Sequence, residues 1–420
     1  MFWTQTTFCV FSVCIQTDFM EKLIQYQTAL LKELDTKFVR YPFESIPWTE
    51  RFIGIKGLRG VGKTTMLLQH LQQHLDLSGK HLYVTLDHPY FYQNSLFELA
   101  ETFYQLGGKT LLVDEVHKMA NWSKQLKIVY DGFPGLQVVF TASSALNIFR
   151  GNADLSRRVL EYSLGGLSFR EYLAYAHQIN IPPYTLPHLL ANHLQISMDL
   201  LAQFMPLPLF KQYLKSGYFP FGKNMEDDLF QARLIRTLEV VLNEDLSYVE
   251  GYTSDNIFKI KQLLAVIAGT APFTINVTQV ADKLGIGRNT VKAFLFALEK
   301  AGLLNYLNRS GHGLSALQKP DKVYLENTNF SHLLQTNPDV GSLRETFLVN
   351  QLKNAGLKIT MPEEGDIEIH VSTGNIILEA GGKHKKTTQV KHIPLFYIAA
   401  DDIETGFMQK IPLYLFGLLY

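Results

Sequence analysis

The stretch RFIGIKGLRGVGKTTMLLQHLQQHL (51–75) decides the fold. It runs from an apolar strand pattern into the loop GLRGVGKT and then into a helix with leucines at core-facing spacing. The loop fits G-x-x-x-x-G-K-[ST], whose backbone N–H groups surround a phosphate at the positive end of the following helix. The predicted nucleotide ligands are Gly57, Leu58, Arg59, Gly60, Val61, Gly62, Lys63, Thr64 and Thr65.

Lys63 and Thr64 have distinct expected roles within this loop. The ammonium of Lys63 would reach the β- and γ-phosphates of a nucleotide, and the hydroxyl of Thr64 would bind Mg²⁺. A glycine-rich turn that binds no nucleotide is the alternative. The strand before the loop and the helix after it are, however, the context that phosphate binding requires. The predicted cofactors are therefore ATP and Mg²⁺.

A phosphate-binding loop needs an acidic partner on a neighbouring strand, and LLVDE (111–115) supplies one. Asp114 would hold Mg²⁺ through water, and Glu115 would polarise the attacking water as a general base. Taken alone, such a pair can also simply end a strand in solvent. Together with the upstream loop, the two carboxyl groups indicate hydrolysis rather than storage of a nucleotide.

Polar residues also end the next apolar run, VVFTASSA (138–145). A polar side chain at the tip of this strand could sense the γ-phosphate, and Thr141 and Ser143 are the candidates, although serines are also ordinary turn residues. Arg157 and Arg158 follow in DLSRRVLEY. An arginine here could stabilise transition-state charge, in its own chain or in a neighbour's site, and a solvated basic pair is the alternative.

The chain around these motifs alternates short apolar runs with helical segments, which is typical of a parallel α/β sheet. With 420 residues, 46% of them hydrophobic, the chain is long enough for about two to four domains with buried cores. Its 39 basic and 39 acidic residues exclude a uniformly basic nucleic-acid coat but allow a local basic patch. The strands expected are 51–56, 81–86, 110–115, 136–142 and about 159–164.

The second half of the chain is expected to be mostly helical and then to form a helix-turn-helix in 276–304. Arg288, Asn289 and Lys292 fall near the exposed start of its second helix, where they suit contacts to phosphates and bases. Between 255 and 310 there are seven basic and three acidic residues, which favours DNA as a partner. Winged helices also serve as protein-contact or structural units, so that alternative stays open.

The C-terminal segment, with strands expected in KVYLEN, DIEIHV and NIILEA, has the layout of a nuclease core. It carries an acidic helix residue, Glu345, a strand acid, Asp366, and a strand ending in Glu379. Sites with two carboxylates and a lysine cut phosphodiesters by holding Mg²⁺ and activating water. A working signature needs lysine two residues after the glutamate, where this chain has Gly381, and Lys383 comes too late. We therefore expect a degenerate nuclease-like fold.

The first nineteen residues, MFWTQTTFCVFSVCIQTDF, lack the Lys and Arg of a secretory signal, and their apolar run is too short for a membrane helix. Met20 opens an amphipathic helical pattern, so translation is expected to begin there, with a disordered arm as the alternative. The chain's two cysteines, Cys9 and Cys14, both lie in this leader, which suits a reducing cytosol. We expect a cytoplasmic protein without a membrane partner.

Further motifs along the chain carry a family resemblance. They are GLRGVGKTTMLLQ, TLLVDEVHKMANWSKQLK, FTASSALNI and SRRVLEYSLGGLSFREYL, followed by LKSGYFP, LRETFLVNQL, ILEAGGKHKK and IPLYLFGLLY. Together they resemble the predicted AAA+-superfamily ATPases of bacteria and archaea, in which a winged helix and a restriction-endonuclease-like domain follow a P-loop domain. The resemblance covers roughly Met20 to Tyr420. Two positions depart from it, Leu58 in place of a common proline and Gly60 in place of a common basic residue.

This resemblance implies an α/β fold class, in which a P-loop NTPase parallel sheet with helices is followed by a helical lid, a winged helix and a small α/β nuclease-like domain. The parts expected are a leader (1–19), a P-loop ATPase domain (20–167), a helical lid (168–254), a winged helix-turn-helix (255–313) and a degenerate restriction-endonuclease-like domain (314–420).

The resemblance also assigns roles at the expected site. The catalytic residues expected are Glu115, Lys63, Ser143 and Arg158, and the metal ligands are Thr64 and Asp114. The expected function is Mg²⁺-dependent ATP hydrolysis that moves the C-terminal half, on DNA, with a protein partner or through self-association. A nucleotide-gated interaction protein without turnover and an ATP-regulated nuclease are the alternatives.

Overall fold

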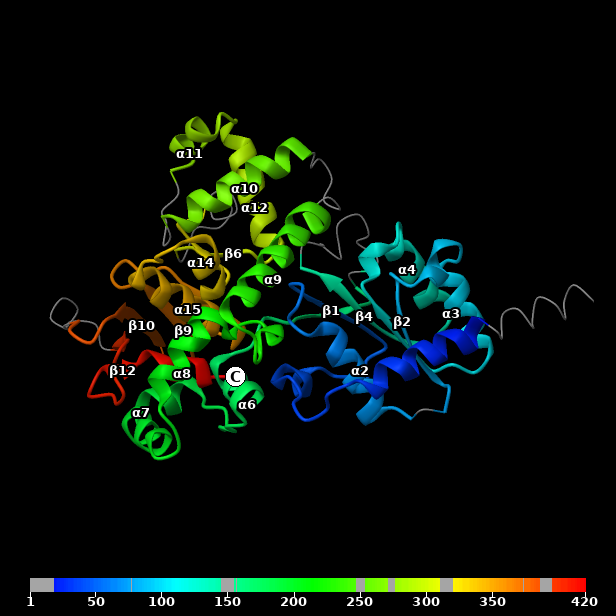
Figure 1. Cartoon of the computed structure of the whole chain (residues 1–420), viewed down its shortest axis with the longest axis horizontal. Coiled ribbons are helices and arrows are strands. Elements are labelled where there is room, and N and C mark those ends of the chain that lie inside the picture. Colours follow the sequence, from blue (N-terminus) through cyan, green and yellow to red (C-terminus); the bar gives the residue numbers. More distant parts are fainter. Residues whose placement is uncertain are drawn as a thin grey trace, which may run out of the picture. The chain divides into compact units, whose positions relative to one another are not determined.

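The computed structural model describes most of the chain, which divides into two compact units, Met1–Leu164 and Gly165–Tyr420 (Figure 1). No helix among the residues described is long and apolar enough to cross a membrane. Residues 1–18 lie outside the described part, so a start of translation at Met20 stays a prediction. The described residues are 19–76, 78–144, 155, 157–246, 254–270, 276–309, 320–372, 374–385 and 395–420.

The first unit is built on a parallel sheet of five strands in the order β2-β3-β4-β1-β5. Each strand lies within one residue of the predicted run at both ends, and the parallel α/β class is confirmed. Because the strands are parallel, the carboxyl ends of β1, β3 and β4 meet at one edge of the sheet. The strands are β1 (Phe52–Gly57), β2 (His81–Thr85), β3 (Thr110–Asp114), β4 (Gln137–Ser143) and β5 (Leu160–Ser163).

Helices cover both faces of this sheet, as Figure 1 shows. Helices α3 (Leu96–Gln105) and α4 (Trp122–Gly132) pack on one face, where alternate strand residues such as Leu111 and Val113 join the same buried apolar cluster. Helix α2 (Lys63–His74) contacts β1, β2, β3 and β4. The chain crosses the sheet in opposite directions before and after β2, so right-handed crossovers place α2 on the other face.

The segment before β1, which includes a short helical turn η1 (Tyr41–Ser45), is fastened to the loop and to α2. Gln69 on α2 donates to two backbone oxygens of this segment at 2.9 and 2.8 Å. The buried guanidinium of Arg40 donates to the carbonyl oxygen of Val61, inside the loop, at 2.5 Å. The indole of Trp48 stacks on the ring of His70 with centroids 4.0 Å apart. The loop is therefore held in place by a segment that no sequence motif identifies.

The second unit begins with a helical region, as the sequence predicts. Prolines stand in the first turns of α7 and α8, where a missing backbone N–H costs nothing. Ser168 begins α6 with a capping box that Glu171 completes. The helices are α6 (Phe169–His177), α7 (Leu186–Leu201), α8 (Pro206–Gln212) and α9 (Asp227–Val240), with the short turns η4 (Tyr213–Gly217), η5 (Pro220–Gly222) and η6 (Val241–Asp245).

Three helices and a two-stranded ribbon follow in the second unit. Gly285 ends α11 in a left-handed conformation, and a short turn leads into α12, so a helix-turn-helix is present. Strands β6 and β7 pair antiparallel. Val280, Leu284 and Val291 are buried, as their spacing predicts. The elements are α10 (Ser254–Ala268), α11 (Val277–Leu284), α12 (Arg288–Lys300), β6 (Leu304–Leu307) and β7 (Lys322–Leu325).

A second sheet of five strands completes the chain, in the order β12-β11-β10-β9-β8. It is mixed, because β10, β11 and β12 run parallel while β8, β9 and β10 alternate in direction. Helix α15 contacts β10 and β8. The elements are α14 (Thr328–Leu334), α15 (Val340–Asn354), β8 (Ile359–Thr360), β9 (Ile367–Val371), β10 (Gly374–Gly381), β11 (Phe396–Ala400), β12 (Lys410–Pro412) and the turn η9 (Leu413–Leu418).

A half-buried carboxylate organises polar contacts within the second unit. Glu326 accepts hydrogen bonds from the hydroxyl of Tyr218 at 3.1 Å and from the side-chain amides of Asn305 at 2.6 Å and Asn350 at 3.1 Å. Burial raises the pKa of Glu326 to about 7, while the nearby Lys353 opposes the rise. The carboxylate thus joins β6, α15 and the chain after η4 without leaving its oxygens unpaired.

Replacing Gly57 with alanine is expected to lower the free energy of unfolding by about 1–3 kcal/mol. A Cβ at this position would lie 2.3 Å from the carbonyl oxygen of Leu164. Urea unfolding of the full chain measures the change. Gly132→Ala is the matched control, because no atom lies within 4 Å of its added Cβ and a helical position favours alanine. Equal stability of the two variants would contradict this close approach.

Candidate nucleotide-binding site

The predicted loop lies between β1 and α2, at the edge where β1, β3 and β4 end. Gly62 has φ 98°, a left-handed conformation that residues with side chains rarely adopt. Helix α2 begins at the next residue, so its free N–H groups and the positive end of its dipole adjoin the loop. Backbone geometry therefore makes this loop a site for an anion such as a phosphate.

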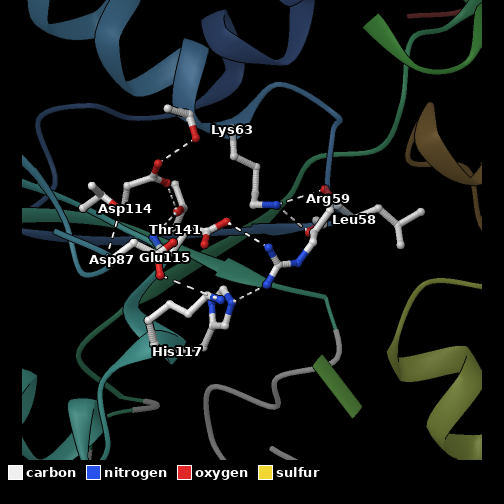
Figure 2. A network of polar contacts seen from close by, with 12 residues as sticks. Leu58, Arg59, Lys63, Asp87, Asp114, Glu115, His117 and Thr141 are labelled. Carbon is white, nitrogen blue, oxygen red and sulfur yellow. Dashed lines mark hydrogen bonds and ion pairs between the residues drawn. The ribbon is translucent and has the colours of Figure 1, made fainter. Parts of the chain in front are cut away.

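Lys63 is only 8% exposed, and its ammonium turns back on the loop (Figure 2). Its Nζ donates to the carbonyl oxygens of Gly57 at 2.8 Å and Leu58 at 2.9 Å. The positive charge is thus concentrated inside the loop, where it can meet phosphate oxygens. Thr65, a further predicted ligand, is exposed in the first turn of α2.

Asp114 is the centre of a hydrogen-bond network that Figure 2 shows. Its Oδ2 accepts from the hydroxyls of Thr64 at 2.6 Å and Tyr83 at 2.9 Å, and its Oδ1 accepts from the hydroxyl of Thr141. Burial and the neighbouring Asp114 raise the pKa of Tyr83, so its hydroxyl stays a donor. The two residues predicted as metal ligands, Thr64 and Asp114, are therefore in direct contact.

Glu115 follows Asp114 in an uncommon backbone conformation. Its φ is 53°, in the left-handed region, where a residue with a side chain pays about 1–2 kcal/mol. Its backbone N–H donates to the hydroxyl of Thr141 at 2.9 Å, so one hydroxyl holds both acidic residues. Burial raises the pKa of the Glu115 carboxyl to about 7, although the Arg59 guanidinium opposes the rise. A carboxylate with such a pKa suits proton uptake near neutral pH.

Arg59 extends from the loop to the turn η3 (Val116–Lys118) that follows Glu115. Its Nη1 lies 3.8 Å from Oε1 of Glu115, and its Nη2 lies 3.4 Å from Nε2 of the buried His117. Lys118, in the same turn, lies 3.8 Å from a carboxylate oxygen of Asp87. These contacts connect the phosphate-binding loop to the turns after β3 and β2.

The structure does not bring Arg158 to the loop of its own chain. Its guanidinium pairs with Asp131, Nη2 to Oδ1, at 3.1 Å and lies over the ring of Tyr130. Strand β5 runs parallel to β1 with Leu160 beside Ile53, so the residue before β5 lies at the amino edge of the sheet. The loop lies at the opposite, carboxyl edge. A catalytic role in its own site does not fit this placement, and a role in a neighbour's site stays a prediction.

Thr141, one of the two polar candidates at the end of β4, has its hydroxyl hydrogen-bonded to both residues of the acidic pair. Ser143 is buried beside Gly57 in the β1–β4 ladder, next to the start of the loop. Both side chains point to the same face of the strand because they are two residues apart. The strand tip therefore offers one hydroxyl near Asp114 and one near the loop.

Tyr83, Arg40 and His117 belong to the site although no motif marks them. Tyr83 stands inside the apolar run of β2, where a buried tyrosine needs a partner for its hydroxyl. That need is the one signal in the sequence that could have linked it to an acid. Arg40 and His117 are distinguished only by the contacts that the fold creates.

The other predicted residues lie in the second unit. Arg288 and Asn289 are exposed at the start of α12, and Lys292 is half-buried one turn later. These positions are those that a helix-turn-helix presents to a nucleic acid. The three carboxylates of the nuclease-like pattern gather on a different part of this unit and contact lysines from outside that pattern.

Two family models match parts of the chain. Residues 49–173 match the model described as an AAA domain, and residues 207–339 match a domain of unknown function. The AAA match spans the phosphate-binding loop, the acidic pair and all five strands of the first sheet. The second match spans α8 through α14, including the helix-turn-helix.

A curated relative, uncharacterized protein MJ1637 of Methanocaldococcus jannaschii, is 27% identical over 308 residues. The match covers 70% of this chain and 63% of that protein. The chain therefore spans less than two thirds of the relative's length.

Solved structures to which the chain is similar include AMPPCP-bound DnaA from Aquifex aeolicus and C. elegans PCH-2. The first is 14% identical with a TM-score of 0.26, over 65% of this chain and 86% of that chain. The second is 15% identical with a TM-score of 0.24, over 67% of this chain and 68% of that chain. The sheet order and the loop geometry identify the first unit as a P-loop NTPase fold, and residues 49–173 match the AAA domain model.

Proposed function

We propose that the chain binds ATP with Mg²⁺ at the P-loop and hydrolyses it. The observation that carries this proposal is the hydrogen bond between Thr64 and Asp114, beside the buried Lys63. A hydroxyl and a carboxylate are the oxygen ligands that Mg²⁺ prefers, and the lysine is the group that meets phosphates. The AAA domain match over residues 49–173 supports the same function.

Each side chain of the site would have a defined part in hydrolysis. Bound between Thr64, Asp114 and the phosphates, Mg²⁺ would neutralise negative charge. Lys63 would bind the same phosphates from the loop. Glu115 would accept the proton of the attacking water, since burial brings its pKa to about 7. Thr141 would keep both acids in place by bonding to each.

The helix-turn-helix of the second unit is proposed to be the part that responds to hydrolysis, with DNA as its target. Exposed Arg288 and Asn289 at the start of α12 support this, since that end of a recognition helix meets bases and phosphates. The ribbon of β6 and β7 would be the wing of a winged helix. The proposed domain order is the one expected above, and a cytoplasmic location stays a prediction.

The second candidate function is a nucleotide-gated switch that binds a protein partner without turnover. The position of Arg59 favours it, because a guanidinium 3.8 Å from Glu115 competes with a water molecule for that carboxylate. Self-association belongs to either proposal, since Arg158 could act only in the site of a neighbouring copy. The rate of phosphate release distinguishes the two functions.

Lys63→Ala is expected to abolish ATP binding, whereas Glu115→Gln is expected to keep binding and to lower turnover by about 10²–10⁴-fold. The lysine contacts phosphates in every state, whereas the glutamate acts only on the attacking water. Titration with a fluorescent ATP analogue and a phosphate-release assay measure the two effects.

Lys124→Ala, at an exposed position of α4, is the control and should match wild type. If wild-type protein binds ATP without releasing phosphate, the proposed ATPase function is rejected and the nucleotide-gated switch remains.

Tyr83→Phe is expected to raise the Mg²⁺ concentration for half-maximal ATP hydrolysis by about tenfold. The change removes one hydroxyl from Asp114 and keeps the aromatic ring. Phosphate release measured across a Mg²⁺ series gives the shift. Tyr104→Phe on α3 is the control that should leave the curve in place. An unshifted curve for Tyr83→Phe would show that this hydroxyl does not hold the carboxylate.

Replacing Arg288 and Lys292 together with alanine is expected to weaken DNA binding about tenfold and to lower the salt slope by about 2. Without these two positive side chains, binding of the protein releases fewer counterions from the DNA. Fluorescence anisotropy with a labelled duplex at several salt concentrations measures both quantities. Lys300→Ala, at the other end of α12, is the control. Unchanged affinity in the double variant would argue for a protein-contact role of the helix-turn-helix.

A further inference from the structure

The three carboxylates of the nuclease-like pattern do converge in the second unit. Glu345 projects from α15, Asp366 stands just before β9, and Glu379 lies in β10. The backbone N–H of Ala380 donates to Oδ2 of Asp366 at 2.9 Å, which ties the end of β10 to the second acid. The three acids therefore share neighbours in the fold, and the cations that they contact can be named.

Lys322 of β7 lies between the first two acids. Its Nζ is 3.1 Å from Oε2 of Glu345 and 3.5 Å from Oδ1 of Asp366. All three side chains are largely shielded, with 17%, 14% and 21% of their surface exposed, in the order lysine, glutamate and aspartate. The ammonium is thus a shared partner of two carboxylates in a partly dry environment, where charge pairs are less screened.

Two further contacts complete this cluster. Tyr324 lies two residues after Lys322, on the same face of β7, and its hydroxyl donates to the same oxygen of Glu345 at 2.9 Å. The third acid, Glu379, pairs with Lys385. Burial and the nearby Asp366 raise the pKa of Glu345, while Lys322 opposes the rise. Each of the three acids therefore faces an ammonium from outside the expected catalytic motif.

This arrangement does not fit the divalent metal ion that a nuclease of this layout needs. Such an ion requires several oxygen ligands around one point, and here Lys322 stands between two of the acids. Among the residues that the structure describes, no group of three or more Asp, Glu, His or Cys could hold a metal ion. The cluster is already supplied with positive charge by its own chain.

We propose that Lys322 is a built-in cation, which takes the place of a metal ion and ties the β6–β7 ribbon to the C-terminal sheet. Lys322 belongs to the ribbon that follows the helix-turn-helix, whereas Glu345 and Asp366 belong to α15 and the approach to β9. Removing the ammonium would leave two shielded carboxylates facing each other, which is costly. This role is independent of ATP binding, because it concerns the second unit alone.

Binding of Mn²⁺ by the full chain without nucleotide tests which cation the acids prefer. Wild type and Asp366→Asn are expected to bind Mn²⁺ equally in an electron-paramagnetic-resonance titration. Lys322→Ala is expected to gain one Mn²⁺ site with an affinity at least about tenfold higher than that of wild type. Adding Asp366→Asn to the Lys322→Ala chain should remove this site. The proposal would be overturned by a Mn²⁺ site in wild type that Asp366→Asn abolishes, or by plasmid nicking that Asp366→Asn abolishes. It would also be overturned if Lys322→Ala gained no Mn²⁺ site.

Stability and hydrogen exchange test the structural role. Lys322→Met is expected to lower the Tm by at least about 4 °C, whereas Lys322→Arg keeps the charge and should stay close to wild type. Lys215→Met is the matched control, because its ion pair with Asp227 is exposed, and its Tm should change by less than about 2 °C. Amide exchange should quicken in β6 and β7 for Lys322→Met alone. Unchanged Tm and exchange would overturn the proposal, and failure of Lys322→Met to fold beside a folded Lys322→Arg would support it.

Discussion

The carboxylate of Asp114 is the constraint on which the site of the first unit depends. It accepts hydroxyls from three other elements, α2, β2 and β4, so a shift of any of them breaks a hydrogen bond to a buried charge. These donors are neutral hydroxyls, so none of them cancels the negative charge of Asp114, which can attract a cation. The acids around Lys322 are the opposite case, because an ammonium already pairs with both of them. Similar carboxylates in the two units thus differ in the charge of their donors.

The fold of the first unit could be predicted well because its signals are local. A buried parallel strand needs a continuous apolar run, and the runs of β1 to β4 became buried strands, while the largely exposed β5 forms the edge. The segment before β1 could not be predicted, because Arg40 and Trp48 act through partners far along the chain. The second sheet shows the same limit. Its strands are visible in the sequence, but the mixed order depends on long-range pairing.

The candidate site divides in the same way. Residues 57–64 are recognisable because the glycines, the lysine and the threonine of the motif stand at fixed spacing along the chain. Lys322 could not be recognised, since it is an ordinary strand residue until distant acids are placed beside it, and the hydroxyl of Tyr83 signals only that some partner is needed. The position of Arg158 could have been predicted from topology. Arg158 precedes β5 and the loop follows the parallel strand β1, so the two lie at opposite edges of the sheet.

Leu164, the last residue of the first unit, gives the phosphate-binding loop a mechanical connection. Its N–H donates to the carbonyl oxygen of Lys56 at 2.7 Å, and its own carbonyl oxygen leaves no room for a side chain on Gly57. The peptide that joins the two units therefore starts beside the first glycine of the loop. Coupling between sites is reciprocal, so if strain at this joint changes the affinity of the loop for a nucleotide, the nucleotide changes the strain by the same free energy. Such a connection works through the covalent chain and needs no interface between the units.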